Sequence, residues 1–302
     1  MNLDARLLLD DCHFPAAGTP VDLAVSGGPD SLGLLLLAMT EPLSVTVHHV
    51  DHHARPMSSK DATFVAELCA QLGVTFVGHD VTVEPGGNFE SRARAARRRA
   101  MPVSVLTGHT MDDLVETVLL NMLRGSGVDG LSPMVGDPTK PLRDLRRRAL
   151  HEFVAASGFV ALHDETNDSP AFRRNRVRHE LVPLIDDIAQ RDVVAIIARQ
   201  AALMYDERVW LDQRGLADGA TSLADADCRD LRQWPVARLR RWLRTQLREP
   251  DHGDGTHPPS ADEVERALGV VRGDVVAVQL HGGRRLARRG QRLTLEQGSP
   301  LR

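Results

Sequence analysis

Two serines, an aspartate and two glycines lie close together in the run Ser26-Gly27-Gly28-Pro29-Asp30-Ser31. Such a run suits phosphate chemistry, because glycines let the backbone approach an oxygen closely and the N–H groups at a helix start donate to it. Pro29 fits a first helical turn, where its missing N–H costs nothing. Asp30 can hold a metal ion that bridges phosphates. We interpret the run as a phosphate cradle, with a plain glycine turn as the alternative.

The residues on either side of the cradle predict the elements that position it. Residues 21–25 alternate as a short buried strand does, and the apolar run Leu32 to Met39 is typical of a helix. The cradle lacks the Gly-Lys-Ser/Thr ending of a Walker A loop and is not a Gly-x-Gly-x-x-Gly motif. A strand, a tight turn and a helix start therefore form the predicted anion site.

Four further acidic residues follow predicted strands. Asp51 ends a strand over 43–50, and Asp112, Asp113 and Glu116 open the helix after a strand over 103–109. Carboxylates that converge at one edge of a sheet are what a metal-bound triphosphate requires, because Mg²⁺ takes carboxylate and phosphate oxygens together. Asp112 and Glu116 are four residues apart and share a helix face. The alternative is that Asp112 and Asp113 only cap the helix dipole.

Arginines cluster in the segment from Phe172 to Glu180. Spacing places Arg174 and Arg178 on one helical face, with Arg173 and Arg176 on a neighbouring one. Guanidinium groups make forked contacts to phosphate, which favours RNA or a nucleotide as the ligand. A solvated charged face is the alternative.

The remaining pattern predicts an α/β fold. Strands over 21–25, 43–50, 74–83 and 103–109 alternate with helices over 32–39, 58–72, 88–100 and 112–124, which is typical of a doubly wound, mostly parallel sheet. A helix over 145–157, helices over 183–210 and 234–247, and a capped helix with short strands after Ser260 follow. We expect a catalytic domain over 1–185, a helical domain over 186–250 and a small α+β element over 258–302.

Composition excludes several classes of protein. The chain has 302 residues, a net charge of −4 and only three cysteines, which stand far apart. They argue against a zinc ribbon, a cysteine-ligated cluster or a disulfide framework and fit a reducing compartment. No apolar run approaches a membrane span, and the N-terminus carries acids where a signal peptide needs bases. We expect a cytoplasmic protein with no membrane partner.

Five stretches together resemble a known family. Ser-Gly-Gly-x-Asp-Ser resembles the pyrophosphate loop, or PP-loop, of the ATP pyrophosphatase superfamily, whose fold is adenine nucleotide alpha hydrolase-like. Within it, four more stretches resemble the tRNA(Ile)-lysidine synthetases, in family order: 49–56, 88–94, 108–127 and 164–179. The chain departs from the family at His53-Ala54 and in the short basic segment from Arg97 to Val103. The C-terminal third resembles the family only loosely.

The resemblance implies a reaction. A family member would use ATP and Mg²⁺ to adenylate the C2 oxygen of the wobble cytidine in the CAU anticodon of tRNA(Ile), and the ε-amine of free L-lysine would displace AMP to give lysidine. A homodimer is also an option. The physical expectation agrees, since an activated carbonyl oxygen needs an in-line phosphate with its charge neutralised. A base must also leave the anticodon stack to reach the site.

The resemblance also assigns roles to residues. It places Asp51, Asp112 and Glu116 near the metal or the chemistry, with Glu116 as a candidate proton acceptor from the amine. Asp113 and Arg124 would contact lysine or cytosine, and Asp30 and Asp112 are the candidate Mg²⁺ ligands. Six residues would bind ATP: Ser26, Gly27, Gly28, Pro29, Asp30 and Ser31. Five would bind tRNA or phosphate: Arg173, Arg174, Asn175, Arg176 and Arg178.

Three other functions are weighed against this one. A PP-loop tRNA cytidine thiolase would share the fold, but it usually needs paired cysteines. A catalytically silent RNA-binding protein is disfavoured by the acids at three strand ends. A small-molecule amidating enzyme would leave the clustered arginines without a purpose.

Overall fold

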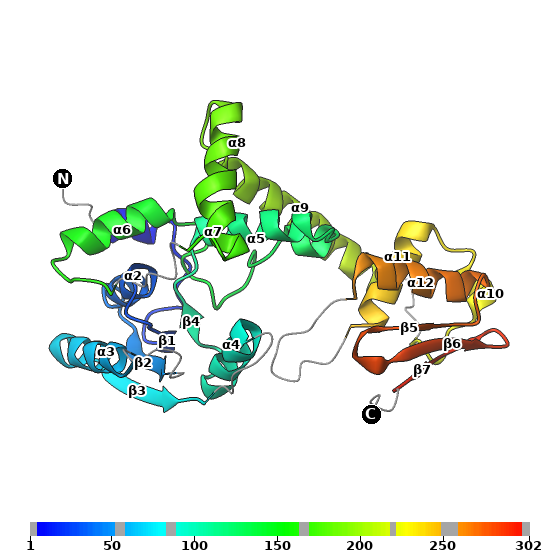
Figure 1. The fold of residues 1–302 in the computed structure, drawn as a ribbon, viewed down its shortest axis with the longest axis horizontal. Helices are drawn as coiled ribbons and strands as arrows, with labels where there is room; N and C mark the ends of the chain where they lie inside the picture. The colour runs from blue at the N-terminus through cyan, green and yellow to red at the C-terminus, as the bar shows by residue number, and fades with distance from the viewer. Residues whose placement is uncertain are drawn as a thin grey trace. The chain divides into compact units, whose positions relative to one another are not determined.

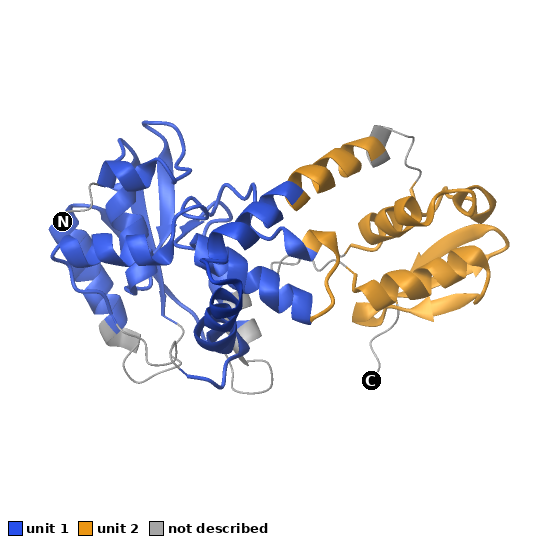
Figure 2. Ribbon diagram, turned by 90° about the horizontal axis from the view of Figure 1, so that it is seen from above, with its two compact units in different colours: residues 1–123, 130–203 blue, residues 124–129, 204–302 orange. Residues whose placement is uncertain are grey.

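The computed structural model describes residues 5–51, 58–82, 89–162, 169–217, 222–248 and 259–297. It divides into two compact units, one of residues 1–123 with 130–203 and one of residues 124–129 with 204–302 (Figure 2). The three-part division at residues 185 and 250 stays a prediction.

The first unit carries the elements expected of an α/β domain (Figure 1). Its strands are β1 (Pro20–Ala24), β2 (Ser44–Asp51), β3 (Thr75–Asp80) and β4 (Leu106–Thr107). Helices up to the fourth strand are α1 (Ala5–Leu9), α2 (Pro29–Ala38), α3 (Ser58–Leu72) and α4 (Phe89–Ala100). Later come α5 (Met111–Leu123), α6 (Arg147–Ala156), α7 (Arg173–Arg176), the π-helical turn η3 (Val177–Leu181) and α8 (Val182–Ala189). A short 3-10 turn, η1 (Val128–Leu131), follows α5, and α9 (Val194–Ala217) leads into the second unit.

The four strands form one parallel sheet in the order β3-β2-β1-β4, which confirms the predicted fold class. Helix α2 is apolar almost all round because it is buried on nearly every side, with Leu32, Leu34, Leu35 and Leu37 fully excluded from solvent. It packs beside α6 (Figure 1). Since α2 begins at the cradle, this burial fixes the position of the predicted phosphate site.

Two predicted elements differ from the structure. The fourth strand covers only Leu106–Thr107, because the Val105 N–H bonds to the carbonyl of Pro102 in a turn and leaves Val103 fully exposed. The helix predicted over 183–210 is two helices, α8 and α9. They separate at Gln190, whose φ of 52° lies in the left-handed region and ends α8.

The second unit has its own core and a small antiparallel sheet in the order β5-β6-β7. Its elements are α10 (Cys228–Leu231), α11 (Val236–Gln246), α12 (Ala261–Arg272), β5 (Ala277–Gln279), η4 (His281–Gly283), β6 (Arg285–Arg289) and β7 (Arg292–Glu296). Ser260 and Glu263 form a capping box at the start of α12, as their spacing predicts. Helix α12 packs on α11 and on strands β5 and β6.

Within the part of the chain that the structure describes, no helix combines the length and the apolar character needed to cross a membrane.

Candidate active site

The cradle has the local geometry of an anion site. The Ser26 N–H donates to the Ser31 hydroxyl at 3.1 Å, the two hydroxyl oxygens lie 3.2 Å apart, and the Ser31 hydroxyl donates to the Gly28 carbonyl at 3.0 Å. Pro29 is the first residue of α2, and Gly28 caps the helix without a side-chain hydrogen bond. No side chain of residue 28 therefore caps the first-turn N–H groups, which is the arrangement that an anion site needs.

The glycines in and beside the cradle differ in backbone conformation and in the space around them. Gly27 has φ +90°, and a Cβ there would lie 2.6 Å from Cδ1 of Leu162, so the fold itself requires glycine. Gly28 has an ordinary φ of −71°, and a Cβ there would lie 3.7 Å from its nearest neighbour, the Ser26 hydroxyl. Gly108, after β4, would place a Cβ 2.5 Å from the Asp30 carbonyl oxygen. The turn after β4 is thus packed directly against the cradle.

Asp30 extends from the first turn of α2 toward α6. Its Oδ1 lies 2.7 Å from Nε2 of His151, and its Oδ2 lies 3.7 Å from Nε of Arg147. The side chain remains one-third exposed. Asp30 therefore has two neighbours from α6 and still faces solvent, as a ligand-binding carboxylate must.

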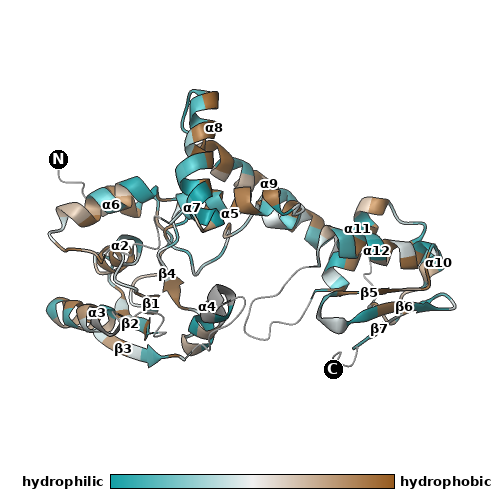
Figure 3. Cartoon of the chain, in the orientation of Figure 1, coloured by the Kyte–Doolittle hydropathy of each residue, from teal (hydrophilic) through white to brown (hydrophobic). Residues whose placement is uncertain are grey.

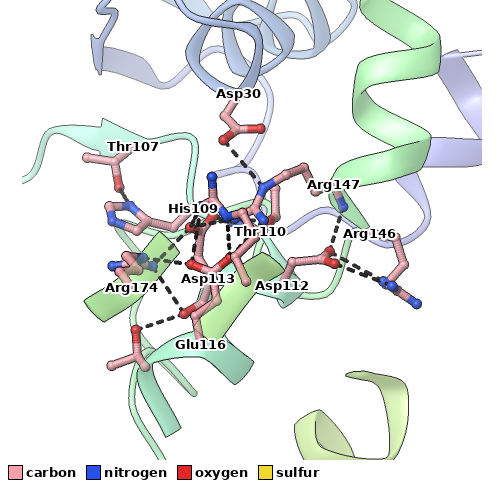
Figure 4. Close-up of polar contacts among 12 residues, drawn as sticks. Asp30, Thr107, His109, Thr110, Asp112, Asp113, Glu116, Arg146, Arg147 and Arg174 are labelled. Atoms are coloured by element: carbon pink, nitrogen blue, oxygen red, sulfur yellow. Dashed lines mark hydrogen bonds and ion pairs between the residues drawn. The ribbon is translucent and has the colours of Figure 1, made fainter. Parts of the chain in front are cut away.

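Asp113 and Glu116, which we call the acid pair, lie on α5 and are almost completely buried (Figure 4). The Thr110 N–H and hydroxyl both donate to Oδ2 of Asp113 at 2.9 Å. Thr110 precedes α5, so this contact also satisfies a donor at the helix start. Asp113 therefore caps the helix and also takes part in the ion pairs of the site.

Three arginines, which we call the arginine ring, neutralise the acid pair: Arg147, Arg174 and Arg178. Arg147 donates to Glu116 at 2.8 Å and to Asp113 at 2.7 Å. Arg174 donates to Glu116 at 2.7 Å and to Asp113 at 2.9 Å, and Arg178 donates to Glu116 at 2.7 Å and 3.2 Å. Buried carboxylates require such partners, because an unpaired charge in the interior is very costly.

The arginine ring determines the protonation of the acid pair. Burial alone would raise the pKa of Asp113, but the charges of Arg147 and Arg174 outweigh it and lower the pKa to about 2. Burial likewise opposes ionisation of Glu116. Its hydrogen bond to Arg178 and the charge of Arg147 outweigh burial and lower the pKa of Glu116. The same acids raise the pKa of Arg147 against its own burial. Both carboxylates are therefore ionised at neutral pH.

Asp112 points away from the acid pair, to the start of α6 (Figure 4). The Arg147 N–H donates to its Oδ2 at 2.7 Å, and Arg146 contacts both carboxylate oxygens at 3.3 Å. Arg146 also pairs with Asp192. Asp112 thus anchors the N-terminus of α6, where a negative charge complements the helix dipole.

The other predicted site residues are distributed as follows. Asp51 is buried at the carboxyl end of β2, opposite Asp80 of β3. Arg124 is exposed directly after the last residue of α5 and belongs to the second unit. The predicted Asp164 to Asp168 block lies outside the described residues.

The arginine segment divides into inward and outward side chains, as its spacing predicts. Arg174 and Arg178 reach the acid pair, whereas Arg173 and Arg176 are exposed and Arg176 pairs with Glu180 at 2.8 Å. Asn175 is buried and donates to the Ser169 carbonyl at 2.9 Å. Helix α7 is hydrophilic along its length (Figure 3). Arg173 and Arg176 therefore face solvent, whereas Arg174 and Arg178 face the acid pair.

Sequence reasoning missed the contribution of α6. Arg146, Arg147 and His151 were not among the predicted site residues, yet they contact Asp112, the acid pair and Asp30. The one available signal was the spacing of Arg147 and His151, which are four residues apart and so share a helix face toward α2. Helix α6 therefore connects the cradle to the acid pair.

This arrangement places the cradle next to buried carboxylates and the guanidinium groups that pair with them. The fold and the cradle define a class, the PP-loop proteins, and the model of the PP-loop domain matches residues 8–185. The chain is 36% identical over 253 residues to a tRNA(Ile)-lysidine synthase of Thermobifida fusca, covering 76% of each chain. It is 35% identical over 238 residues to the one of Rhodococcus erythropolis, covering 75% of this chain and 73% of that protein. The chain belongs to the tRNA(Ile)-lysidine synthase family.

A solved structure supports the fold at greater distance. The U34-tRNA thiolase NcsA from Methanococcus maripaludis matches with a TM-score of 0.54 at 15% identity, over 67% of this chain and 78% of that one. At this identity the likeness concerns the fold alone. The cysteines of this chain do not favour a thiolase, because Cys12 follows α1, Cys69 lies in α3 and Cys228 lies in α10, and burial raises the pKa of each thiol.

Proposed function

We propose that this protein is the ligase that converts the wobble cytidine of the CAU anticodon of tRNA(Ile) to lysidine. The observation that carries the proposal is the acid pair inside an arginine ring beside the cradle, in a chain of the lysidine synthase family. Groups suited to bind an anion and carboxylates suited to attract a cation adjoin there. The proposed reaction needs both, because its substrates are a triphosphate and an amine.

The first step is adenylation. The C2 oxygen of cytosine attacks the α-phosphorus of ATP, the bond to the β-phosphate oxygen breaks, and pyrophosphate leaves. The cradle N–H groups and the hydroxyls of Ser26 and Ser31 stabilise the phosphate charge. Arg147, near Asp30, adds positive charge at the same place.

A magnesium ion fits this step at Asp30. Mg²⁺ is commonly bound by one or two carboxylates together with substrate phosphates, and it neutralises the charge on the phosphates. Asp30 meets that description, since it lies on the cradle and is one-third exposed. Asp112 fits less well, because Arg146 and the Arg147 N–H already occupy its oxygens.

The second step is displacement of AMP. The ε-amine nitrogen of lysine attacks C2 of the adenylated cytosine, the bond from C2 to the adenylate oxygen breaks, and the nitrogen releases a proton. Asp113 and Glu116 are suited to bind the ε-ammonium group by charge. The lowered pKa of Glu116 makes it a weak base, which favours binding and orientation over proton acceptance.

Two incubations test the proposal. Labelled L-lysine, ATP and total tRNA should yield labelled RNA, and tRNA(Ile) with a CAU anticodon should be the labelled species. Exchange of labelled pyrophosphate into ATP in the presence of that tRNA should report adenylation. A catalytically silent RNA-binding protein would give neither signal, and a thiolase would not incorporate lysine.

Two further expectations belong to this proposal. Arg173 and Arg176 face solvent and are suited to hold tRNA phosphates. A homodimer and a cytoplasmic location stay predictions, and size measurement in solution and cell fractionation would test them.

A further inference from the structure

The acid pair has no free acceptor site. Each of its four carboxylate oxygens accepts two hydrogen bonds, those on Asp113 from Thr110, Arg147 and Arg174, and those on Glu116 from all three arginines. A carboxylate offers about four lone-pair positions in total. A substrate ammonium group therefore finds the acid pair fully occupied by the protein's own cations.

The three arginines are not equivalent. Arg147 is 13% exposed and also approaches Asp30, whereas Arg174 and Arg178 are 32% and 25% exposed. Arg178 lies in the π-helical turn η3, where the Val182 N–H bonds back to the Val177 carbonyl. Single π-helical turns are frequent at functional sites. Arg174 and Arg178 are thus the accessible members, and Arg147 is the anchored one.

Phosphate competes with carboxylate for guanidinium groups. Both anions accept forked hydrogen bonds of similar geometry, so an arginine can exchange one for the other. We propose that Arg174 and Arg178 are transferable counter-ions, which occupy the acid pair in the free enzyme and move to substrate phosphate. The acid pair then binds the ammonium group of lysine, with Arg147 as the positioning residue that remains. This inference rests on the proposed function, which supplies the amine substrate.

The consequence is an order of binding. In the free enzyme the three guanidinium groups balance the charges of Asp113, Glu116 and Asp30. Once two guanidinium groups transfer, the acid pair is negative and attracts a cation. Lysine therefore binds tightly only after a phosphate-bearing substrate, so the amine enters when its target is present.

Calorimetric titration of the full chain with L-lysine tests this order. We expect the Kd of lysine to tighten about 5- to 150-fold, the usual range of coupling between sites, when a non-hydrolysable ATP analogue with Mg²⁺ or tRNA(Ile) is present. If the ATP analogue lowers the Kd of lysine, the nucleotide supplies the phosphate, and if tRNA(Ile) lowers it, RNA supplies the phosphate. Because coupling between two sites is reciprocal, lysine must lower the Kd of that ligand by the same factor. A Kd that is the same alone and in both arms overturns the proposal.

Variants sharpen the test. Arg178→Met should tighten lysine binding to the free enzyme and reduce the coupling, because one competing cation is gone, and Arg174→Met should do the same. Arg148→Met is the matched control, since Arg148 is 88% exposed and pairs with Glu152 rather than with the acid pair. Weaker lysine binding by folded Arg178→Met and Arg174→Met proteins would contradict the proposal.

The proposed function fails separately from this inference. If the wild-type protein incorporates lysine into tRNA but its Kd for lysine does not depend on ATP analogue or tRNA, the inference of transferable counter-ions is wrong and the proposed function stands. If the wild-type protein incorporates no lysine, the function is wrong and the inference falls with it.

Discussion

The hydrogen bonds that shape the cradle lie within residues 26–31, whereas the acid pair depends on arginines from α6, α7 and η3. The cradle presents backbone N–H groups and small hydroxyls, and it carries one partly exposed charge, Asp30. The acid pair is buried and carries two carboxylates against three guanidinium groups. The cradle therefore depends on local backbone geometry, and the acid pair on long-range electrostatic balance.

This difference determines how each region responds to mutation. A change at Asp30 or Gly28 should alter binding and leave the fold intact, because Asp30 is partly exposed and Gly28 has room for a methyl group. Gly27 is the exception, since its φ of +90° requires glycine. A change in the acid pair should alter stability first, because breaking a buried ion pair leaves an uncompensated charge.

Glu116→Ala should cost about 3–5 kcal/mol of folding free energy, the usual cost of removing one partner from a buried ion pair. Glu116 is the partner of all three arginines, so its loss leaves guanidinium groups without a balancing charge. Urea unfolding measures the effect. The control is Glu152→Ala, which breaks an exposed pair with Arg148 and should cost less than about 1 kcal/mol. Equal losses in the two variants would remove the contrast.

Asp30→Ala should reduce pyrophosphate exchange about 10²- to 10³-fold, as loss of one preorganised polar group commonly does. Stability should change little, because Asp30 is one-third exposed and lies at the protein surface. Exchange assays and urea unfolding on the same preparation separate the two effects. An Asp30→Ala protein that exchanges pyrophosphate normally would exclude the cradle aspartate from the chemistry.

The two regions also differ in how far the sequence predicts them. The cradle, the start of α2 at Pro29 and the capping box at Ser260 were predictable, because the groups that interact are within five residues of each other. The parallel sheet was predictable from alternating strands and helices. These features depend on local spacing, which a single sequence displays directly.

The arginine ring was not predictable in this way. Arg147 is 31 residues from Glu116, Arg174 is 58 and Arg178 is 62. Spacing shows that Arg174 and Arg178 share a face, but not which anion that face meets. Sequence favoured phosphate, and the structure places Asp113 and Glu116 there. Only tertiary packing of α5, α6 and α7 decides such contacts.

Acid should weaken the fold through the acid pair. The pKa of Asp113 is lowered from 3.8 to about 2 in the folded protein, so its stabilising effect is complete above about pH 4 and is lost as the pH falls toward 2. A shift of that size corresponds to roughly 2–3 kcal/mol, and Glu116 acts in the same direction. Urea unfolding at several pH values measures it. Asp113→Asn should flatten the curve below pH 4, and an unchanged slope would show that other groups carry the dependence.

Substitution of Gly27 or Gly28 by alanine should have the smallest effects on stability, and the two substitutions should differ from each other. Gly27→Ala should cost about 1–2 kcal/mol for its left-handed φ of +90°, and more from the contact with Leu162. Gly28→Ala should change stability by less than about 1 kcal/mol, because φ −71° suits alanine and the nearest atom is 3.7 Å away, while alanine is a poorer N-cap than glycine.

For ATP binding, we expect Gly28→Ala to have the larger effect of the two variants. A phosphate that approaches the backbone at Gly28 leaves no room for a methyl group, so Gly28→Ala should raise the KM for ATP while the protein unfolds as the wild type does. Urea unfolding and ATP titration of both variants provide the comparison. If Gly28→Ala binds ATP normally, the phosphate does not lie at the N-terminus of α2. The fold would then still explain why residue 27 is glycine, but nothing would explain the glycine at residue 28.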